Sequence, residues 1–220
     1  MTDVHNLGLF ILAGWLLNLT PGPDVLFIVS SALRSGAKAG VVAALGITAG
    51  CFVHIFAAAV GVSALMAASA TAFTVLKWLG TAYLIYVGLR LLFASNQSAM
   101  KIEANEAYLT GATGPKRLKT TFLRGFWTNA LNPKVALFFL AFLPQFIAPG
   151  VVNKPLAFLL LGLLFSFNGL WVNIGWALAA AWLAGRATLV QRSMRWLDRI
   201  AGVLFISFGI KLALTDSPNA

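Results

Sequence analysis

The sequence predicts an all-α membrane protein of six transmembrane helices, arranged as two inverted three-helix repeats with broken first and fourth helices. Three observations predict this class. The 220 residues are 60% hydrophobic and 10% charged, with a mean hydropathy of +0.86, whereas soluble domains carry about 25% charged residues. The apolar residues gather into six long segments. The first and fourth segments each contain proline near mid-length.

A helix that crosses a membrane needs about 20 mostly apolar residues. The six segments that meet this requirement are residues 7–31, 40–68, 78–94, 125–147, 156–183 and 196–214. The sixth carries Asp198, Arg199 and Lys211 near its ends, where long basic side chains reach the interface. No Lys or Arg precedes the first segment, so we expect a retained helix rather than a cleavable signal peptide.

Basic residues are distributed unequally between the connections. Twelve of the sixteen flank the connections after the first, third and fifth segments, whereas Lys77, Lys154 and Lys211 lie at the opposite ends. The positive-inside rule therefore places both termini outside and the middle loop, about residues 95–121, in the cytoplasm. Because topology accounts for the net charge of +10, we do not expect nucleic acid as a partner.

The middle loop divides a single transmembrane domain, residues 1–220, into repeat one (about 1–94) and repeat two (about 122–220). Similar motifs occur in the same order in both. The third and sixth segments begin with a basic residue and Trp-Leu, at 77 and 195, and the second and fifth contain Leu-Gly, at 45 and 161. Three spans per repeat give halves of opposite orientation, in which paired broken helices point to the binding site.

The interruptions are Asn-Leu-Thr-Pro-Gly-Pro-Asp at 18–24 and Asn-Ala-Leu-Asn-Pro-Lys at 129–134. Each proline removes a backbone donor, and carbonyl groups freed at membrane depth must be buried in protein or line a wet cavity. Aligning Pro23 with Pro133 places Asp24 opposite Lys134. We expect these two charges to pair with each other or to share a water-filled cavity, because an unpaired charge in hydrocarbon is costly.

Six motifs together resemble one known family. They are Thr-Pro-Gly-Pro-Asp at 20–24, Arg-Ser-Gly-Ala-Lys-Ala-Gly at 34–40, Leu-Gly-Ile-Thr-Ala-Gly at 45–50, Gly-Thr-Ala-Tyr-Leu at 80–84, Asn-Pro-Lys at 132–134 and Phe-Leu-Pro-Gln-Phe at 142–146. Over nearly the whole chain they resemble the lysine/threonine exporter family (LysE/RhtB). The resemblance implies a secondary transporter of the bacterial cytoplasmic membrane that exports amino acids or related metabolites, driven by the proton motive force.

The candidate substrate-binding or coupling residues lie at the interruptions and in the neighbouring spans. They are Asp24, Lys134, Asn18, Thr20, Pro21, Gly22, Pro23, Asn129, Asn132, Pro133, His54 and Asn168. The N-terminus of a half-helix suits a substrate carboxylate, and freed carbonyl groups suit an ammonium group. The neutral polar side chains would bind the substrate or would only satisfy backbone groups freed by the kinks.

Four charged or polar residues have alternative roles. Asp24 would bind the substrate ammonium or carry the coupled proton, or it would form a structural ion pair with Lys134, which would otherwise attract the substrate carboxylate. His54 would relay a proton or hydrogen-bond to a neighbouring helix. Asn168 would line the path or join helices.

Other classes of protein find less support. Two histidines, one cysteine and scattered carboxylates show no metal-ligand spacing, and we expect no cofactor. Gly-Val-Ser-Ala at 61–64 has no base placed against its serine, so a membrane-embedded hydrolase is the weakest reading. A cation exporter or channel would favour several deep carboxylates, and only Asp24 is deep. Gly46 and Gly50 allow close packing, within the chain or in a homodimer.

Overall fold

The computed structural model describes residues 6–62, 64, 70–93, 115–148, 151–184, 196, 199–200, 202–207, 209–210 and 213–214. Over these residues the chain is all-helical, which confirms the predicted class for this part. By length and composition, two helices could cross a membrane, Pro23–Val62 and Lys154–Trp182, and the bent pair Lys116–Ala130 and Pro133–Phe146 would make a third. The count of six spans stays a prediction.

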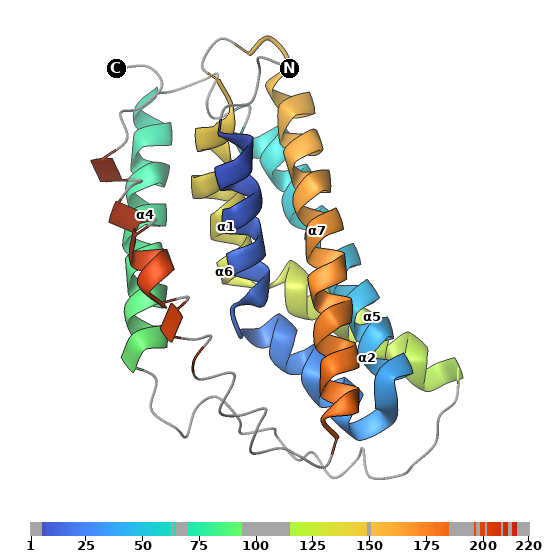
Figure 1. The fold of residues 1–220 in the computed structure, drawn as a ribbon. Helices are drawn as coiled ribbons and strands as arrows, with labels where there is room; N and C mark the ends of the chain where they lie inside the picture. Colours follow the sequence, from blue (N-terminus) through green and yellow to red (C-terminus); the bar gives the residue numbers. More distant parts are fainter. Residues whose placement is uncertain are drawn as a thin grey trace.

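The helices follow one another with short interruptions (Figure 1). In chain order they are α1 (Leu7–Leu19), α2 (Pro23–Ala57), the π-helical η1 (Ala58–Val62), α4 (Ala70–Phe93), α5 (Pro115–Ala130), α6 (Pro133–Leu137), the π-helical η3 (Phe138–Phe142), the 3-10 helix η4 (Leu143–Phe146) and α7 (Lys154–Trp182). The described residues of the sixth predicted segment, 196–214, are also helical.

Two helices begin earlier than the apolar pattern predicts. α4 begins at Ala70, ahead of the predicted 78–94. α5 begins at Pro115, so its first turns lie within residues 95–121, the segment expected to be a loop. Proline is favoured in the first turn of a helix, and a polar helix can extend beyond an apolar span. The signal for a span therefore marks the membrane segment and not the whole helix.

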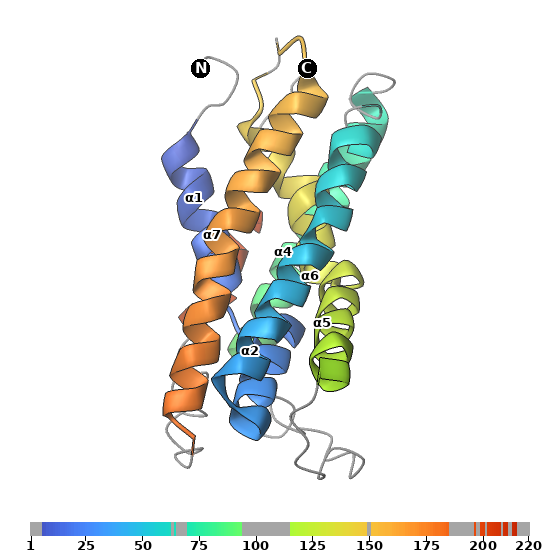
Figure 2. The same ribbon diagram turned by 90° about the vertical axis from the view of Figure 1, so that its right-hand side faces the viewer.

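α2 consists of two arms that reverse direction at Gly36. This residue has φ 80° and ψ 175°, a conformation that glycine adopts without steric cost. A Cβ atom on Gly40 would lie 2.7 Å from the Cβ of Ala32, whereas eight residues of straight helix would separate them by about 12 Å. The exposed Arg34 and Lys38 flank the reversal, which separates the segments predicted at 7–31 and 40–68 (Figures 1 and 2).

Two further interruptions lie along the length of the bundle. α1 ends at Leu19 and α2 begins at Pro23, with Thr20 in an extended conformation between them. The second interruption separates Ala130 from Pro133, and the helix axis bends there by 45°. Each lies beside a proline, Pro21 and Pro23 in the first and Pro133 in the second, and Figure 1 shows that both lie away from the ends of the bundle.

Glycines bring the helices into close contact. A Cβ atom on Gly46 of α2 would overlap the carbonyl oxygen of Phe122 in α5, and one on Gly125 would lie 2.7 Å from the carbonyl oxygen of Ala43. The buried core that includes residues of α1 and α7 is rich in phenylalanine. The rings of Phe138 and Phe165 have their centroids 4.8 Å apart, and the same core joins α1, η3, η4 and α7.

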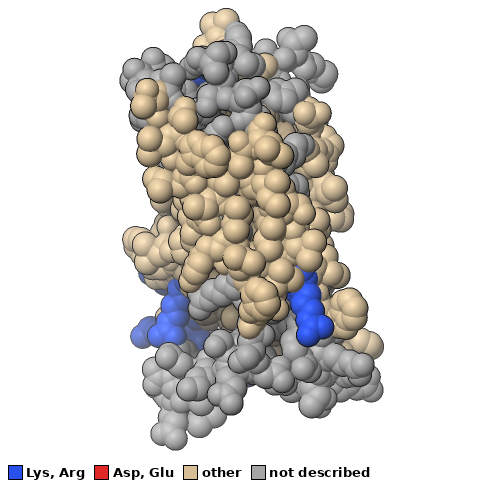
Figure 3. Space-filling view, turned by 90° about the vertical axis from the view of Figure 1, so that its left-hand side faces the viewer, with Lys and Arg blue, Asp and Glu red and all other residues tan. Residues whose placement is uncertain are grey.

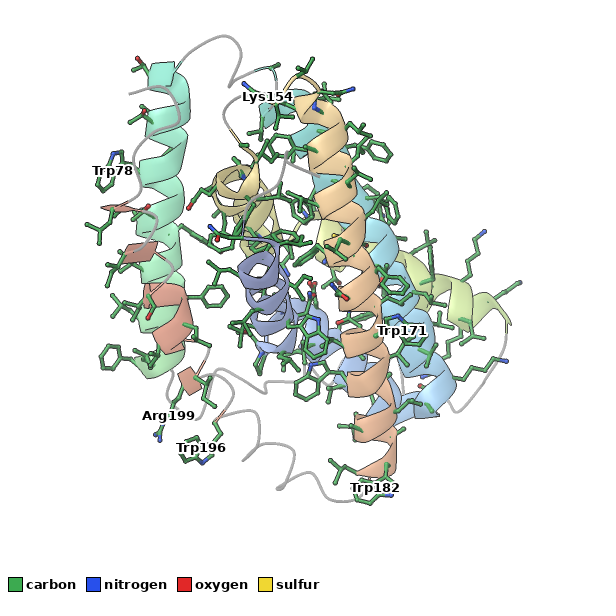
Figure 4. The ribbon with its side chains drawn as sticks, turned by 45° about the horizontal axis from the view of Figure 1, so that its top comes forward. Trp78, Lys154, Trp171, Trp182, Trp196 and Arg199 are labelled. Atoms are coloured by element: carbon green, nitrogen blue, oxygen red, sulfur yellow. The ribbon has the colours of Figure 1, made fainter. Side chains whose placement is uncertain are left out.

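One face of the bundle is apolar around its middle. On the face drawn in Figure 3, a broad belt shows no charged side chain among the described residues, and Lys and Arg side chains gather near one end. Trp171, which is 60% exposed, projects outward from α7. Figure 4 places Trp182, Trp196 and Arg199 at one end of the bundle and Lys154 at the other. Such a belt with aromatic and basic ends suits a bilayer.

The glycine crossing gives a test of the packing. Gly46→Ala forces apart the backbones of α2 and α5, so we expect a loss of stability of about 1–3 kcal/mol, measured as a lower melting temperature of the purified protein. Gly175→Ala on α7 meets nothing within 4 Å and is the matched control, for which we expect no loss. Equal melting temperatures for the two variants would contradict this packing.

Candidate functional site

The prolines decide which carbonyl groups need new partners at the interruptions. In an α-helix the carbonyl of residue i accepts a hydrogen bond from the N–H of residue i+4, and proline has no N–H. Pro21 therefore removes the donor for Leu17, and Pro133 removes the donor for Asn129. A buried carbonyl without a donor is costly at membrane depth, so each requires a partner from elsewhere in the chain.

Side chains far away in the sequence supply these partners. Nζ of Lys134 donates to the carbonyl oxygens of Leu17, at 3.1 Å, and Thr20, at 3.2 Å. Nε2 of His54 lies 2.8 Å from the carbonyl oxygen of Asn129. Because a carbonyl can only accept, Nε2 of His54 carries the proton. Each interruption is thus completed by a side chain from the other predicted repeat.

Asp24 is buried at the start of α2, with 8% of its surface exposed. Its Oδ2 accepts a hydrogen bond of 2.8 Å from Nδ2 of Asn129. Asn129 therefore contacts Asp24 through its side chain and His54 through its carbonyl group. This chain of contacts connects both arms of α2 with the end of α5. Cys51, also buried, lies within electrostatic reach of Asp24.

Asn132 positions the residues of the second interruption. Its Oδ1 accepts a hydrogen bond of 3.0 Å from the backbone N–H of Lys134, which is the usual way that asparagine caps a helix. Pro133 follows in the first turn of α6, where its missing N–H costs α6 itself no hydrogen bond. The cap fixes the first turn of α6, from which the side chain of Lys134 extends toward the end of α1.

Several buried polar atoms near the interruptions have no hydrogen-bond partner among the described residues. They are Oδ1 of Asp24, Oδ1 of Asn129 and Nδ2 of Asn132. An unpaired buried polar group costs about 1–3 kcal/mol, and proteins keep few of them. This set offers both acceptors and a donor, so it suits a polar ligand that has groups of both kinds.

The remaining candidates serve their own helix or lie beside the interruptions. Nδ2 of Asn18 donates to the carbonyl oxygen of Gly14 at 2.8 Å, and the hydroxyl of Thr20 donates to that of Leu16. These bonds satisfy backbone groups near the end of α1. Asn168 is partly buried on α7, next to Gly169, where a Cβ atom would lie 3.0 Å from Oδ1 of Asn18. Their roles in binding stay predictions.

Sequence reasoning missed a pattern that the two interruptions share. Gly-Trp-Leu-Leu-Asn at 14–18 ends one residue before the last residue of α1, and Gly-Phe-Trp-Thr-Asn at 125–129 does the same in α5. In both, the glycine and the asparagine face a neighbouring helix, α7 for α1 and α2 for α5. Leu17 was also missed, because its contribution is a carbonyl group and not a side chain.

No group of His, Cys, Asp and Glu that could hold a metal ion occurs within the part of the chain that the structure describes.

The bond between Asn129 and Asp24 can be tested through stability. Asn129→Ala removes the donor to a buried carboxylate, so we expect a loss of about 1–3 kcal/mol, seen as a lower melting temperature. Thr128→Ala is the matched control, because its hydroxyl bonds only to the carbonyl of Arg124 in the same helix and is exposed. An Asn129→Ala protein as stable as Thr128→Ala would exclude a structural role for this bond.

Comparison with known proteins gives consistent results. The model of the LysE type translocator family matches residues 15–216. A homoserine/homoserine lactone efflux protein of Salmonella typhimurium is 32% identical over 209 residues, which cover 93% of this chain and 94% of that protein. A leucine efflux protein of Enterobacter sp. is 26% identical over 210 residues, 96% of each chain. An uncharacterized membrane protein of Bacillus subtilis is 30% identical over 223 residues, 96% of this chain and 100% of that protein.

No solved structure matches the chain significantly. The family match spans most of the sequence and includes both interruptions. It confirms the resemblance inferred from the motifs at 20–24 and 132–134, and the apolar helices agree with a membrane protein. The chain therefore belongs to the LysE type translocator family.

Proposed function

We propose that this protein is a secondary active exporter of amino acids or related metabolites across the bacterial cytoplasmic membrane. Its substrate site would lie at the two interruptions, between α1 and α2 and between α5 and α6. The observation that carries this proposal is the buried polar network of Asp24, Asn129 and His54 inside a largely apolar bundle. The relatives named leucine efflux protein and homoserine/homoserine lactone efflux protein support a small substrate that carries an amino group.

The chemistry of the site fits a zwitterion. An ammonium group needs acceptors, and the interruptions offer the carbonyl oxygens of Leu17 and Thr20 and the free Oδ1 of Asp24. A carboxylate needs donors, and Nδ2 of Asn132 is a buried donor without a partner among the described residues. The N-terminus of α2 adds a partial positive charge. One molecule with both groups would satisfy atoms at both interruptions.

The proposed architecture is six spans in two inverted repeats. It is supported by the alternating directions of the helices in Figure 1, by the shared Gly-aromatic-x-x-Asn pattern, and by the reciprocal contacts of Lys134 and His54. The end of the bundle that carries Arg34 and Lys38 would face the cytoplasm, and both termini would lie outside.

Proton coupling is proposed through Asp24. One oxygen of its carboxylate accepts from Asn129 and the other has no partner among the described residues. The titratable groups around it are Cys51, His54 through Asn129, and Lys134, whose Nζ lies over Gly22. A carboxylate that binds a proton loses the charge that attracts an ammonium group. Proton and substrate would therefore exclude each other at Asp24, which is the requirement for antiport.

Transport assays test the exporter directly. Proteoliposomes with an imposed pH gradient and a panel of labelled amino acids, including leucine and homoserine, are expected to show gradient-dependent movement of at least one compound against its concentration gradient. Empty liposomes provide the background. Movement of none of them, together with conduction of an inorganic cation, would replace the proposal with the alternative of a cation exporter or channel.

The coupling role of Asp24 has its own test. Asp24→Asn keeps the shape of the side chain but cannot carry a negative charge. We therefore expect the part of transport that the pH gradient drives to disappear completely. Ser30→Ala in the same arm of α2 is the matched control, because its hydroxyl bonds to the carbonyl of Phe27 in its own helix. If Asp24→Asn transported with the pH dependence of the unmodified protein, Asp24 would not be the coupling group.

A further inference from the structure

The ammonium group of Lys134 lies on the backbone of the first interruption. It donates to the carbonyl oxygens of Leu17 and Thr20, at 3.1 and 3.2 Å. A Cβ atom on Gly22 would lie 3.2 Å from Nζ, so the missing side chain of this glycine leaves room for the ammonium. Lys134 reaches this place from α6, more than a hundred residues away in the sequence.

The carbonyl groups at this place form a site for a cation. Leu17 lies in the last turn of α1, where the helix carries a partial negative charge, and its i+4 donor is replaced by Pro21. The neighbouring carbonyl of Leu16 is already occupied, because it accepts from the backbone N–H and the hydroxyl of Thr20. The oxygens of Leu17 and Thr20 are therefore the acceptors that the interruption presents to a cation.

The ammonium of a lysine and the α-ammonium of an amino acid are the same chemical group, with three N–H donors and one positive charge. Carbonyl oxygens that hold one can hold the other. We propose that the carbonyls of Leu17 and Thr20 are the subsite for the ammonium group of the exported molecule, and that Lys134 occupies this subsite for most of the time while substrate is absent. The inference rests on the proposed export function, which it makes specific at one subsite.

This arrangement has a physical advantage for a transporter. An interruption without a cation would leave buried carbonyl oxygens unpaired, and the side chain of Lys134 prevents this in the substrate-free protein. The substrate must then displace Lys134, so its apparent affinity is reduced by the fraction of time that the subsite is occupied. Weaker binding favours release of the substrate, which an exporter needs as much as it needs binding.

A chemical probe tests the subsite without any transport. Lys134→Ala leaves the carbonyls of Leu17 and Thr20 without their ammonium, so the purified variant is expected to melt at a lower temperature. Butylammonium, which has three N–H donors, should raise that temperature, whereas tetramethylammonium, which has none, should not. Lys154→Ala, at the N-terminus of α7, is the control and should respond to neither. An equal response of Lys134→Ala to both cations, or to neither, would overturn the proposal.

Two further results complete the test. If Lys134→Ala does not yield folded protein, solubilisation and purification in butylammonium should recover it, and failure to recover it counts against the subsite.

Lys134→Met should bind the exported amino acid about tenfold more tightly if Lys134 occupies the subsite nine-tenths of the time. Weaker binding would instead assign Lys134 to the substrate carboxylate. If the unmodified protein binds no amino acid, the export function fails, while the butylammonium result still decides the subsite.

Discussion

The need of every buried carbonyl group for a donor organises this protein. In hydrocarbon no water replaces a missing backbone donor, and Pro21 and Pro133 each remove one at the end of a half-helix. The carbonyls that they release are bonded by Lys134 and His54. Because each donor comes from the other half of the chain, neither interruption is complete by itself. The same bonds that repair the helices also hold the two halves together.

Such bonds require the helices to lie very close, and glycine makes this possible. A Cβ atom on Gly50 would overlap the backbone of α5 at Phe126 and would lie 3.0 Å from the Cβ of Asn129. The close crossing of α2 and α5 brings Asn129 within reach of both Asp24 and His54. A bulkier residue at this crossing would move the end of α5 away from both. Small residues therefore act here on the polar site as well as on helix packing.

The parts of the structure that depend on local signals were predictable. Composition predicts the all-α membrane class, proline places both interruptions, and the Arg34–Gly36–Lys38 stretch separates the two arms of α2. The contacts between the halves were not predictable in the same way. Aligning the prolines places Asp24 opposite Lys134, a pairing that stays a prediction, and it does not indicate the hydrogen bonds that join Asp24 to Asn129 and Lys134 to Leu17. The angles at which the helices cross and the depth of each side chain in the bundle decide those partners. The periodicity of hydrophobic residues encodes neither.

The two interruptions are alike in backbone and opposite in charge. Each follows a half-helix that ends with the same glycine and asparagine spacing, and each is followed by proline and a charged residue, Asp24 in one and Lys134 in the other. A repeat with two acids would select cations, and one with two bases would select anions. With one of each, the proposed site keeps a single acid for a substrate ammonium group, and its base holds the backbone carbonyls until that ammonium group displaces it. For the exporter proposed above, the acid at one interruption and the buried Nδ2 of Asn132 at the other, which has no partner among the described residues, fit a zwitterion better than an inorganic ion.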